Sequence, residues 1–230
     1  MDHRRYRRRQ GRESRFESVD GCERGINMSE KIKVAVLVSG GGTNLQALID
    51  KEADGQIPDA HIVKVIASRE DAFALERAAK AGIETAVAKE PQQIMEELQK
   101  SGADMIVLAG YMKVLPKEII EQYRNKIINI HPSLIPKYCG KGFYGKRVHK
   151  AVLEGGEKES GATVHFVDEG VDTGEIILQE KVPVLEGDTP DELAARVLKV
   201  EHRILAEGLN QIAAKIQVEK MKSDEKGGKR

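Results

Sequence analysis

An amide and an imidazole lie two residues apart in Asn129-Ile130-His131-Pro132, within an otherwise apolar stretch. Residues 127–131 predict a short strand, because they are rich in β-branched side chains and a proline follows them. Alternate side chains of a strand share a face, so Asn129 and His131 point the same way. Pro132 leaves His131 at the carboxyl end of the strand, where open α/β sheets bind ligands. The structural alternative is a buried Asn and His satisfied by loop backbone.

A carboxylate joins this pair at Asp172, in an Asp-Thr-Gly turn. An Asn amide and a protonated imidazole can donate hydrogen bonds to the oxyanion of a tetrahedral intermediate. A neighbouring carboxylate favours the charged imidazole and raises its pKa. No Ser or Cys lies in a G-x-S-x-G elbow. Asn129, His131 and Asp172 therefore predict acyl transfer directly to an incoming nucleophile, unless Asp172 only stabilises an Asx turn.

A glycine-rich turn, Ser39-Gly-Gly-Gly-Thr-Asn44, lies between an apolar run at 32–38 and an amphipathic segment at 45–52. This order of strand, glycine turn and helix is typical of phosphate sites, because glycines let the backbone approach the ligand and a helix N-terminus presents free N–H groups. The spacing fits neither G-x-G-x-x-G nor a Walker loop, so it favours a single phosphate. The alternative is a plain turn with Thr43 or Asn44 as the helix N-cap.

The elements that position these residues alternate between strand and helix. This pattern is typical of βαβ units and a parallel sheet. Two later strands are close enough to form an antiparallel hairpin, and a long helix follows with Thr189 as its N-cap. We therefore expect one α/β domain, a parallel sheet extended by antiparallel strands and flanked by helices. The expected strands are 32–38, 61–68, 84–88, 104–110, 127–131, 161–167 and 175–184, and the expected helices are 45–52, 71–81, 91–100, 116–123, 147–154 and 190 to about 215.

Composition places the chain among globular proteins, with 40% hydrophobic and 32% charged residues in 230. No apolar run approaches the roughly 20 residues of a membrane span. A net charge of zero gives no general attraction for nucleic acid or an anionic membrane. Cys22 and Cys139 provide neither a disulfide framework nor metal-site spacing. We therefore expect a cytoplasmic protein that binds small molecules and no metal.

The two ends of the chain differ from its middle. Residues 1–27 hold eight arginines and no lysine, with acidic residues between them and no apolar core of a secretory signal. They fit a basic tail for RNA or phosphate, a transit peptide, or a leader-like, non-native extension. The extension is favoured, because a start at Met28 leads directly into the first strand. We expect residues 1–27 to be disordered, 28–217 to form the domain and 218–230 to be a solvated tail.

A loop rich in lysine and aromatic residues, Lys137 to Lys146, follows the strand of His131. Its position suits a lid or rim over an anionic substrate, and the alternative is an ordinary mobile surface loop. Cys139 would be reactive if its lysine neighbours lowered its pKa, but nothing else indicates a cysteine nucleophile.

Five motifs together resemble the phosphoribosylglycinamide formyltransferase family. The similarity extends from about Lys31 to Lys215. The N-x-H-P-S-L-x-P segment marks the wider folate-dependent formyltransferases, and the glycine loop narrows the resemblance to this branch. The motifs are Ser39-Gly-Gly-Gly-Thr-Asn-Leu-Gln46, Leu108-Ala-Gly-Tyr-Met112, Asn129-Ile-His-Pro-Ser-Leu-Ile-Pro136, Thr163-Val-His-Phe-Val167 and Asp172-Thr-Gly174.

The resemblance implies a Rossmann-like formyltransferase fold and formyl transfer from 10-formyltetrahydrofolate to the amine of 5-phosphoribosylglycinamide, a step of de novo purine synthesis. It implies that Asn129 and His131 polarise the formyl oxygen, while Asp172 keeps His131 protonated and shuttles protons through water. Binding residues carry over by the same motifs: Gly42, Thr43, Asn44 and Glu201 for the ribotide, and Met112, Lys113, Val114, Leu115 and Asn129 for the folate.

The chain departs from this family pattern in two places. An arginine that contacts the folate in relatives has no counterpart between Gly82 and Asp104, and the loop from Cys139 to Lys146 is longer and more basic. The runner-up is a formyltetrahydrofolate hydrolase, in which water replaces the amine. A methionyl-tRNA formyltransferase normally adds an RNA-binding domain, and a non-catalytic nucleotide-binding module would use the glycine loop alone. We expect a monomer or a homodimer.

Overall fold

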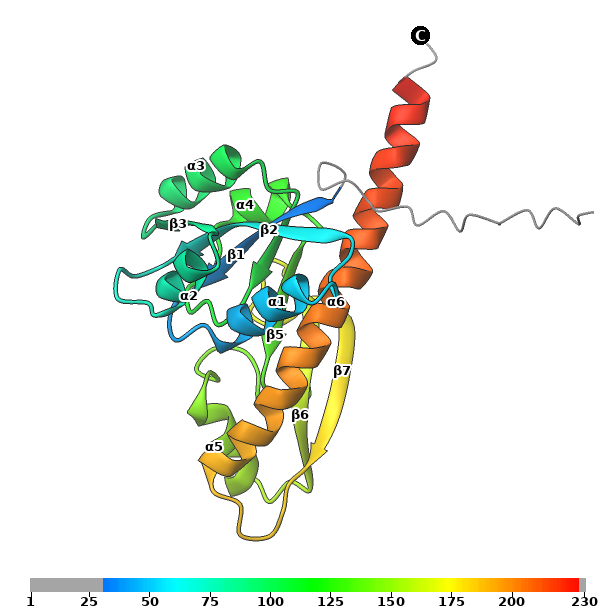
Figure 1. Ribbon diagram of the computed structural model, residues 1–230. Coiled ribbons are helices and arrows are strands. Elements are labelled where there is room, and N and C mark those ends of the chain that lie inside the picture. The colour runs from blue at the N-terminus through cyan, green and yellow to red at the C-terminus, as the bar shows by residue number, and fades with distance from the viewer. Residues whose placement is uncertain (1–30, 228–230) are drawn as a thin grey trace, which may run out of the picture.

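Seven strands form one sheet in the order β3-β2-β1-β4-β5-β6-β7 in the computed structural model (Figure 1). The structure describes residues 31–227, with side chains as far as Ser223, so the expectations for residues 1–27, Met28 and 228–230 lie outside the described residues. The strands are β1 (Ile32–Val38), β2 (Ala60–Ala67), β3 (Glu84–Val87), β4 (Met105–Leu108), β5 (Ile127–His131), β6 (Glu159–Phe166) and β7 (Ile176–Pro183). The helices are α1 (Thr43–Ala53), α2 (Ala74–Lys80), α3 (Pro91–Ser101), α4 (Lys117–Gln122), α5 (Lys146–Glu154) and α6 (Pro190–Gly227).

The first five strands pair in parallel, and β6 and β7 extend the sheet in the antiparallel sense. Runs of Val, Ile and Leu in β1 and β4 suit the parallel part, because strands covered on both faces carry apolar side chains on both. β6 and β7 form the expected hairpin. The predicted α/β fold, a parallel sheet extended by antiparallel strands, is confirmed.

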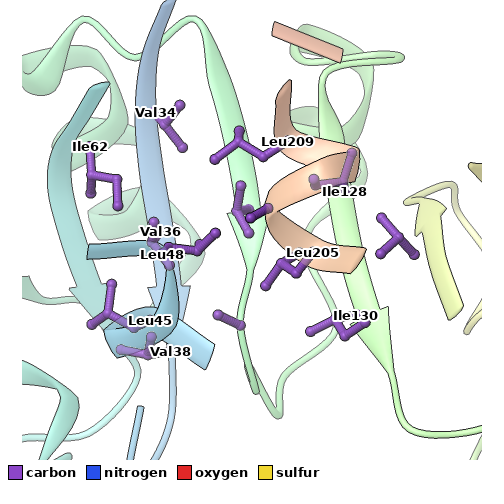
Figure 2. Packing of buried hydrophobic residues seen from close by; sticks show 14 of the residues in the cluster. Val34, Val36, Val38, Leu45, Leu48, Ile62, Ile128, Ile130, Leu205 and Leu209 are labelled. Atoms are coloured by element: carbon purple, nitrogen blue, oxygen red, sulfur yellow. The ribbon is translucent and has the colours of Figure 1, made fainter. Parts of the chain in front are cut away.

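Apolar side chains on the two faces of the sheet pack under different helices. On one face, Ile128 and Ile130 of β5 join side chains from α1 and α6 (Figure 2). On the other face, Ile127 packs with side chains from α3 and α4. Asn129 and His131 alternate with Ile128 and Ile130, so they point to the second face. The sheet therefore separates the polar residues of β5 from the larger core.

Helix α6 runs along the sheet beside α1 and α5, and its end projects beyond the sheet (Figure 1). Its start is capped as predicted, because Thr189 Oγ1 accepts the Glu192 N–H at 3.3 Å and the Glu192 carboxylate accepts the Thr189 N–H at 2.8 Å. The helix continues to Gly227 and does not end near Lys215. No Gly or Pro interrupts this extension, and Lys220 Nζ reaches Asp104 Oδ1 at 2.5 Å. No helix of the described chain combines the length and apolarity that a membrane span requires.

Candidate active site

Four polar side chains meet at the carboxyl end of β5. Asp172, in the connection between β6 and β7, faces both predicted partners: its Oδ1 lies 3.5 Å from Asn129 Nδ2 and its Oδ2 lies 3.5 Å from His131 Nδ1. His165 of β6 is the fourth member, with Nε2 3.1 Å from Asn129 Nδ2 and 3.6 Å from Asp172 Oδ1. The structure therefore brings the three predicted residues together and adds a second imidazole.

His165 joins this cluster because of the register between β5 and β6. The two strands are antiparallel, with Asn129 opposite His165 and His131 opposite Thr163. Directly opposed residues share a face of the sheet. The sequence places Thr163 and His165 on one face of a strand, but it does not reveal which residues they oppose, so His165 was missed. Its Nδ1 lies 2.7 Å from the carbonyl of Phe166 and so carries hydrogen, which leaves Nε2 to accept from the Asn129 amide.

His131 is buried, and both of its ring nitrogens face acceptors. Nε2 donates to the carbonyl of Tyr138 at 3.0 Å, while Nδ1 faces Asp172. Burial lowers the pKa of His131, and the Tyr138 carbonyl and the Asp172 carboxylate oppose this effect only in part. Asp172 raises the pKa of His131 as expected, but desolvation outweighs the carboxylate, so the pKa lies below its ordinary value. The imidazole is neutral at neutral pH.

Asp172 is fixed by its backbone and by one hydrogen bond. Its φ of 57° lies in the left-handed region that few residues other than Gly adopt. Its Oδ2 accepts the N–H of Gly140 at 2.9 Å, which joins the 137–146 loop to the cluster. Burial on its own would raise the pKa of Asp172, but the neighbouring His165 and His131 imidazoles and the Gly140 N–H together lower it below its usual value. Asp172 is therefore a carboxylate at neutral pH.

The glycine-rich turn enters α1 without a side-chain cap. Gly42 is the N-cap, with a left-handed φ of 70°, so neither Thr43 nor Asn44 caps the helix. A Cβ on residue 42 would also lie only 2.6 Å from the Cβ of Ala74, and both constraints require glycine there. The first N–H groups of a helix have no intrahelical acceptor. The N-terminus of α1 therefore remains open to an anion.

A hydrogen bond joins the first helix to the last beside this turn. Asn44 Nδ2 donates to Glu201 Oε2 at 2.8 Å, and both residues are buried. Within the described chain, Asn44 Oδ1 has no hydrogen-bond partner. Burial raises the pKa of Glu201, and the Asn44 amide opposes this rise. A hydroxyl group of a ligand would supply the donor that the buried Asn44 Oδ1 lacks.

The segment 110–115 connects β4 to α4 and forms an apolar wall. The Met112 N–H donates to Ser39 Oγ at 2.9 Å, which ties this segment to the end of β1. Leu115 is buried, whereas Met112 and Val114 are 55% and 69% exposed. Apolar side chains this exposed, in a segment that also lines a cavity, are typical of a ligand surface.

One cavity of about 590 Å³ is lined by the polar cluster at the end of β5, by the start of α1 with Glu201, and by segment 110–115. Its size suits a small-molecule site. Residues 140–145 of the basic loop form part of its wall. Gly42 lies outside the lining, and within residues 31–223 no cluster of three His, Cys, Asp or Glu could hold a metal ion. The other predicted site residues line the cavity: Thr43, Asn44, Met112, Lys113, Val114, Leu115, Asn129, His131, Asp172 and Glu201.

His149 of α5 lines the same cavity and was not predicted. Its side chain is buried, and Nδ1 has no hydrogen-bond partner among the described residues. Burial lowers the pKa of His149 to about 4, with a smaller contribution from His131. A single His in a helix gives no sequence signal of this position.

Known proteins match the chain over most of its described length. The formyl transferase family model matches residues 32–209. A chloroplastic phosphoribosylglycinamide formyltransferase of Arabidopsis thaliana is 42% identical over 78% of this chain, and the match spans 65% of that relative, just under two-thirds of its length. The phosphoribosylglycinamide formyltransferase of Haemophilus influenzae is 44% identical over 75% of this chain and 82% of that protein. The crystal structure of glycinamide ribonucleotide transformylase 1 from Symbiobacterium toebii has a TM-score of 0.75 and 42% identity, covering 80% of this chain and 89% of that chain.

Proposed function

The chain belongs to the formyl transferase family, and we propose that it transfers the formyl group of 10-formyltetrahydrofolate to the amine of 5-phosphoribosylglycinamide, below called the ribotide. The products are the formylated ribotide and tetrahydrofolate, a step of purine synthesis. One observation carries the proposal: a single cavity joins a helix N-terminus suited to phosphate to an Asn-His-Asp group whose histidine is buried. A non-catalytic nucleotide-binding module would need only the first of these.

The reaction needs donors for an oxyanion and a carrier for one proton. The amine nitrogen attacks the formyl carbon, and the tetrahedral intermediate then breaks its bond to N10 of the folate. Asn129 Nδ2 donates to the oxyanion, and the His131 imidazolium adds positive charge. His131 begins neutral because burial lowers its pKa, so it can take the proton that the amine loses and return it to N10. Asp172, 3.5 Å from Nδ1, stabilises the imidazolium between the two transfers.

The ribotide binds with its phosphate on the glycine-rich turn. The N–H groups of Gly42, Thr43 and Asn44 serve as donors, and the dipole of α1 favours the negative charge. Glu201 accepts hydrogen bonds from the ribose hydroxyls, which offsets the cost of burying its carboxylate. In this proposed orientation the glycinamide amine points toward the Asn129 end of the cavity.

The folate binds along the segment 110–115. Met112, Val114 and Leu115 provide apolar contact for the pterin, and Asn129 lies at the reacting end. Lys113, whose Nζ donates to the carbonyl of Lys89 at 2.6 Å, carries a positive charge on this wall for the carboxylates of the folate tail. That charge compensates for the folate-contacting arginine that the chain lacks.

The partners proposed for the protein are these two small molecules, without metal or nucleic acid, in a monomer or a homodimer in the cytoplasm. The zero net charge supports the exclusion of nucleic acid. The name of the plant relative assigns that protein to the chloroplast, so the compartment varies among relatives. Fractionation of the source cells tests the cytoplasmic assignment.

A formyl-transfer assay tests the proposal. Purified protein is mixed with 10-formyltetrahydrofolate, with and without the ribotide, and release of tetrahydrofolate is followed. Release that depends on the ribotide is the expected result. Release without the ribotide would identify a hydrolase. Ribotide binding without release of tetrahydrofolate would support the alternative of a non-catalytic nucleotide-binding module.

A further inference from the structure

Helix α2 holds the glycine-rich turn from behind through two carbonyl groups. The N–H of Ala74 donates to the carbonyl of Gly40 at 3.1 Å, and Arg77 Nε donates to the carbonyl of Gly41 at 2.8 Å. In a trans peptide the carbonyl and the following N–H point in opposite directions. The N–H groups of Gly41 and Gly42 therefore point away from α2.

Arg77 is itself held in place by two further contacts. Its Nη1 donates to Gln46 Oε1 on α1 at 3.1 Å. Its guanidinium lies over the ring of Phe73, 5.0 Å from the centroid. A planar guanidinium with these contacts has little freedom to turn, so the direction of its Nε–H is fixed. Arg77 thus acts as a bracket between α1, α2 and the turn.

Arg77 does not line the main cavity. Its side chain approaches the turn from the side of α2, where Gly42 also packs so closely on Ala74 that a Cβ would lie 2.6 Å from the Ala74 Cβ. Any effect of Arg77 on a ligand in the cavity must therefore pass through the backbone of residues 40–42 or through its charge.

We propose that Arg77 is a positioning residue for the phosphate of the ribotide. By holding the Gly41 carbonyl, it aims the Gly42 N–H at the phosphate without contacting the phosphate itself. The inference rests on the proposed function, because it takes the phosphate to lie on this turn. Arg77 lies outside the glycine-rich motif, so the motif alone does not identify it as part of the phosphate site.

The test is the substitution Arg77→Ala in the full chain, with separate KM values for the ribotide and for 10-formyltetrahydrofolate. The KM for the ribotide should rise about tenfold, the size expected for one lost hydrogen bond from a charged group. The kcat at saturating ribotide and the KM for the folate should stay within about twofold. Thermal melting shows whether the variant is folded.

Two companion variants separate loop geometry from charge. Lys80→Ala removes a positive charge from the same helix, 5.9 Å from the same Phe73 ring, and it should leave both KM values unchanged. Arg77→Lys keeps the charge but cannot hold Gly41 and Gln46 in the same fixed geometry, so its KM should lie nearer to that of Arg77→Ala than to wild type.

The proposal is overturned if Arg77→Ala binds the ribotide like wild type, or if Arg77→Lys restores full affinity. It is also overturned if Lys80→Ala weakens the ribotide as much as Arg77→Ala does, because charge would then explain the effect. Failure of the proposed function looks different, since the wild-type protein would then show no turnover that depends on the ribotide.

Discussion

One end of the cavity offers a ligand backbone N–H groups, whereas the other offers side chains. At the glycine-rich turn, hydrogen bonds from α2 fix the backbone, and the N-cap is a glycine. At the carboxyl end of β5, Asn129, His131, His165 and Asp172 contact one another, and the pKa values of His131 and Asp172 depart from their ordinary values. The first end depends on chain geometry, and the second depends on ionisation.

The difference explains how each end can fail. A backbone site loses function when the chain cannot take its conformation, so substitutions that add a Cβ matter most. A side-chain site loses function when one group is removed or changes its charge, even when the fold is intact. Substrate affinity should therefore report on the first end, and turnover should report on the second.

The largest effect is expected from His131→Ala. Removing the imidazole deletes both the proton carrier and a positive charge at the oxyanion, so kcat should fall about 10³-fold. The affinity for the ribotide, measured by calorimetry, should stay within about twofold. His61→Ala, on the distant β2, is a control that should keep normal turnover. Near wild-type turnover in His131→Ala would contradict the catalytic role proposed for His131.

Gly42→Ala is expected to damage the backbone end instead. A left-handed residue other than Gly costs about 1–2 kcal/mol, and the added Cβ would lie 2.6 Å from the Ala74 Cβ. The turn must shift, so the KM for the ribotide should rise about 100-fold. Gly41→Ala is the matched control, because a Cβ there meets nothing within 4 Å. Equal effects of the two variants would show that the left-handed conformation is unimportant.

Acid should lower the free energy of unfolding of the protein through His149, which lines the cavity at the side-chain end. Its pKa is about 4 in the folded protein and about 6.5 when unfolded, so the unfolded chain binds more protons between these values. The stabilisation of about 3 kcal/mol is present above pH 6.5 and is lost as the pH falls through 4. Urea unfolding between pH 7.5 and pH 4.5 measures this loss. In His149→Leu the decline should be smaller, and an identical decline would contradict the assignment.

The smallest effect is expected from Ser39→Ala, at the boundary between the two ends. Ser39 Oγ accepts the Met112 N–H and lies 2.7 Å from Ser68 Oγ. Its loss should raise the KM for 10-formyltetrahydrofolate about threefold to fivefold, because segment 110–115 loses its tie to β1. The KM for the ribotide should not change. Ser68→Ala keeps the Ser39 acceptor and should be milder.

Features set by local pattern could be predicted from the sequence. β1 and β5 begin and end at the predicted residues, because each run starts after a lysine and is stopped by Ser39-Gly40 or by Pro132. The shared face of Asn129 and His131 follows from the two-residue repeat of a strand. In contrast, α2 begins at Ala74 and not at Asp71, whose carboxylate pairs with Arg69 in the preceding turn.

Features set by contacts between distant segments could not be predicted. His165 depends on the antiparallel register, and Arg77 depends on how closely α2 packs on the turn. The direction of the His131 pKa shift depends on how deeply the ring is buried, which the neighbouring residue types do not specify. Each of these needs the tertiary structure.

The hydrogen bond between Asn44 and Glu201 joins residues 157 positions apart. During translation the ribosome releases Asn44 early, whereas α6 emerges only after every strand of the sheet. Until α6 docks, a nascent chain lacks the Glu201 carboxylate of the proposed ribotide site and leaves the apolar face under α6 exposed to chaperones. The proposed ribotide site is therefore complete only after α6 has been synthesised past Glu201 and has docked on the sheet.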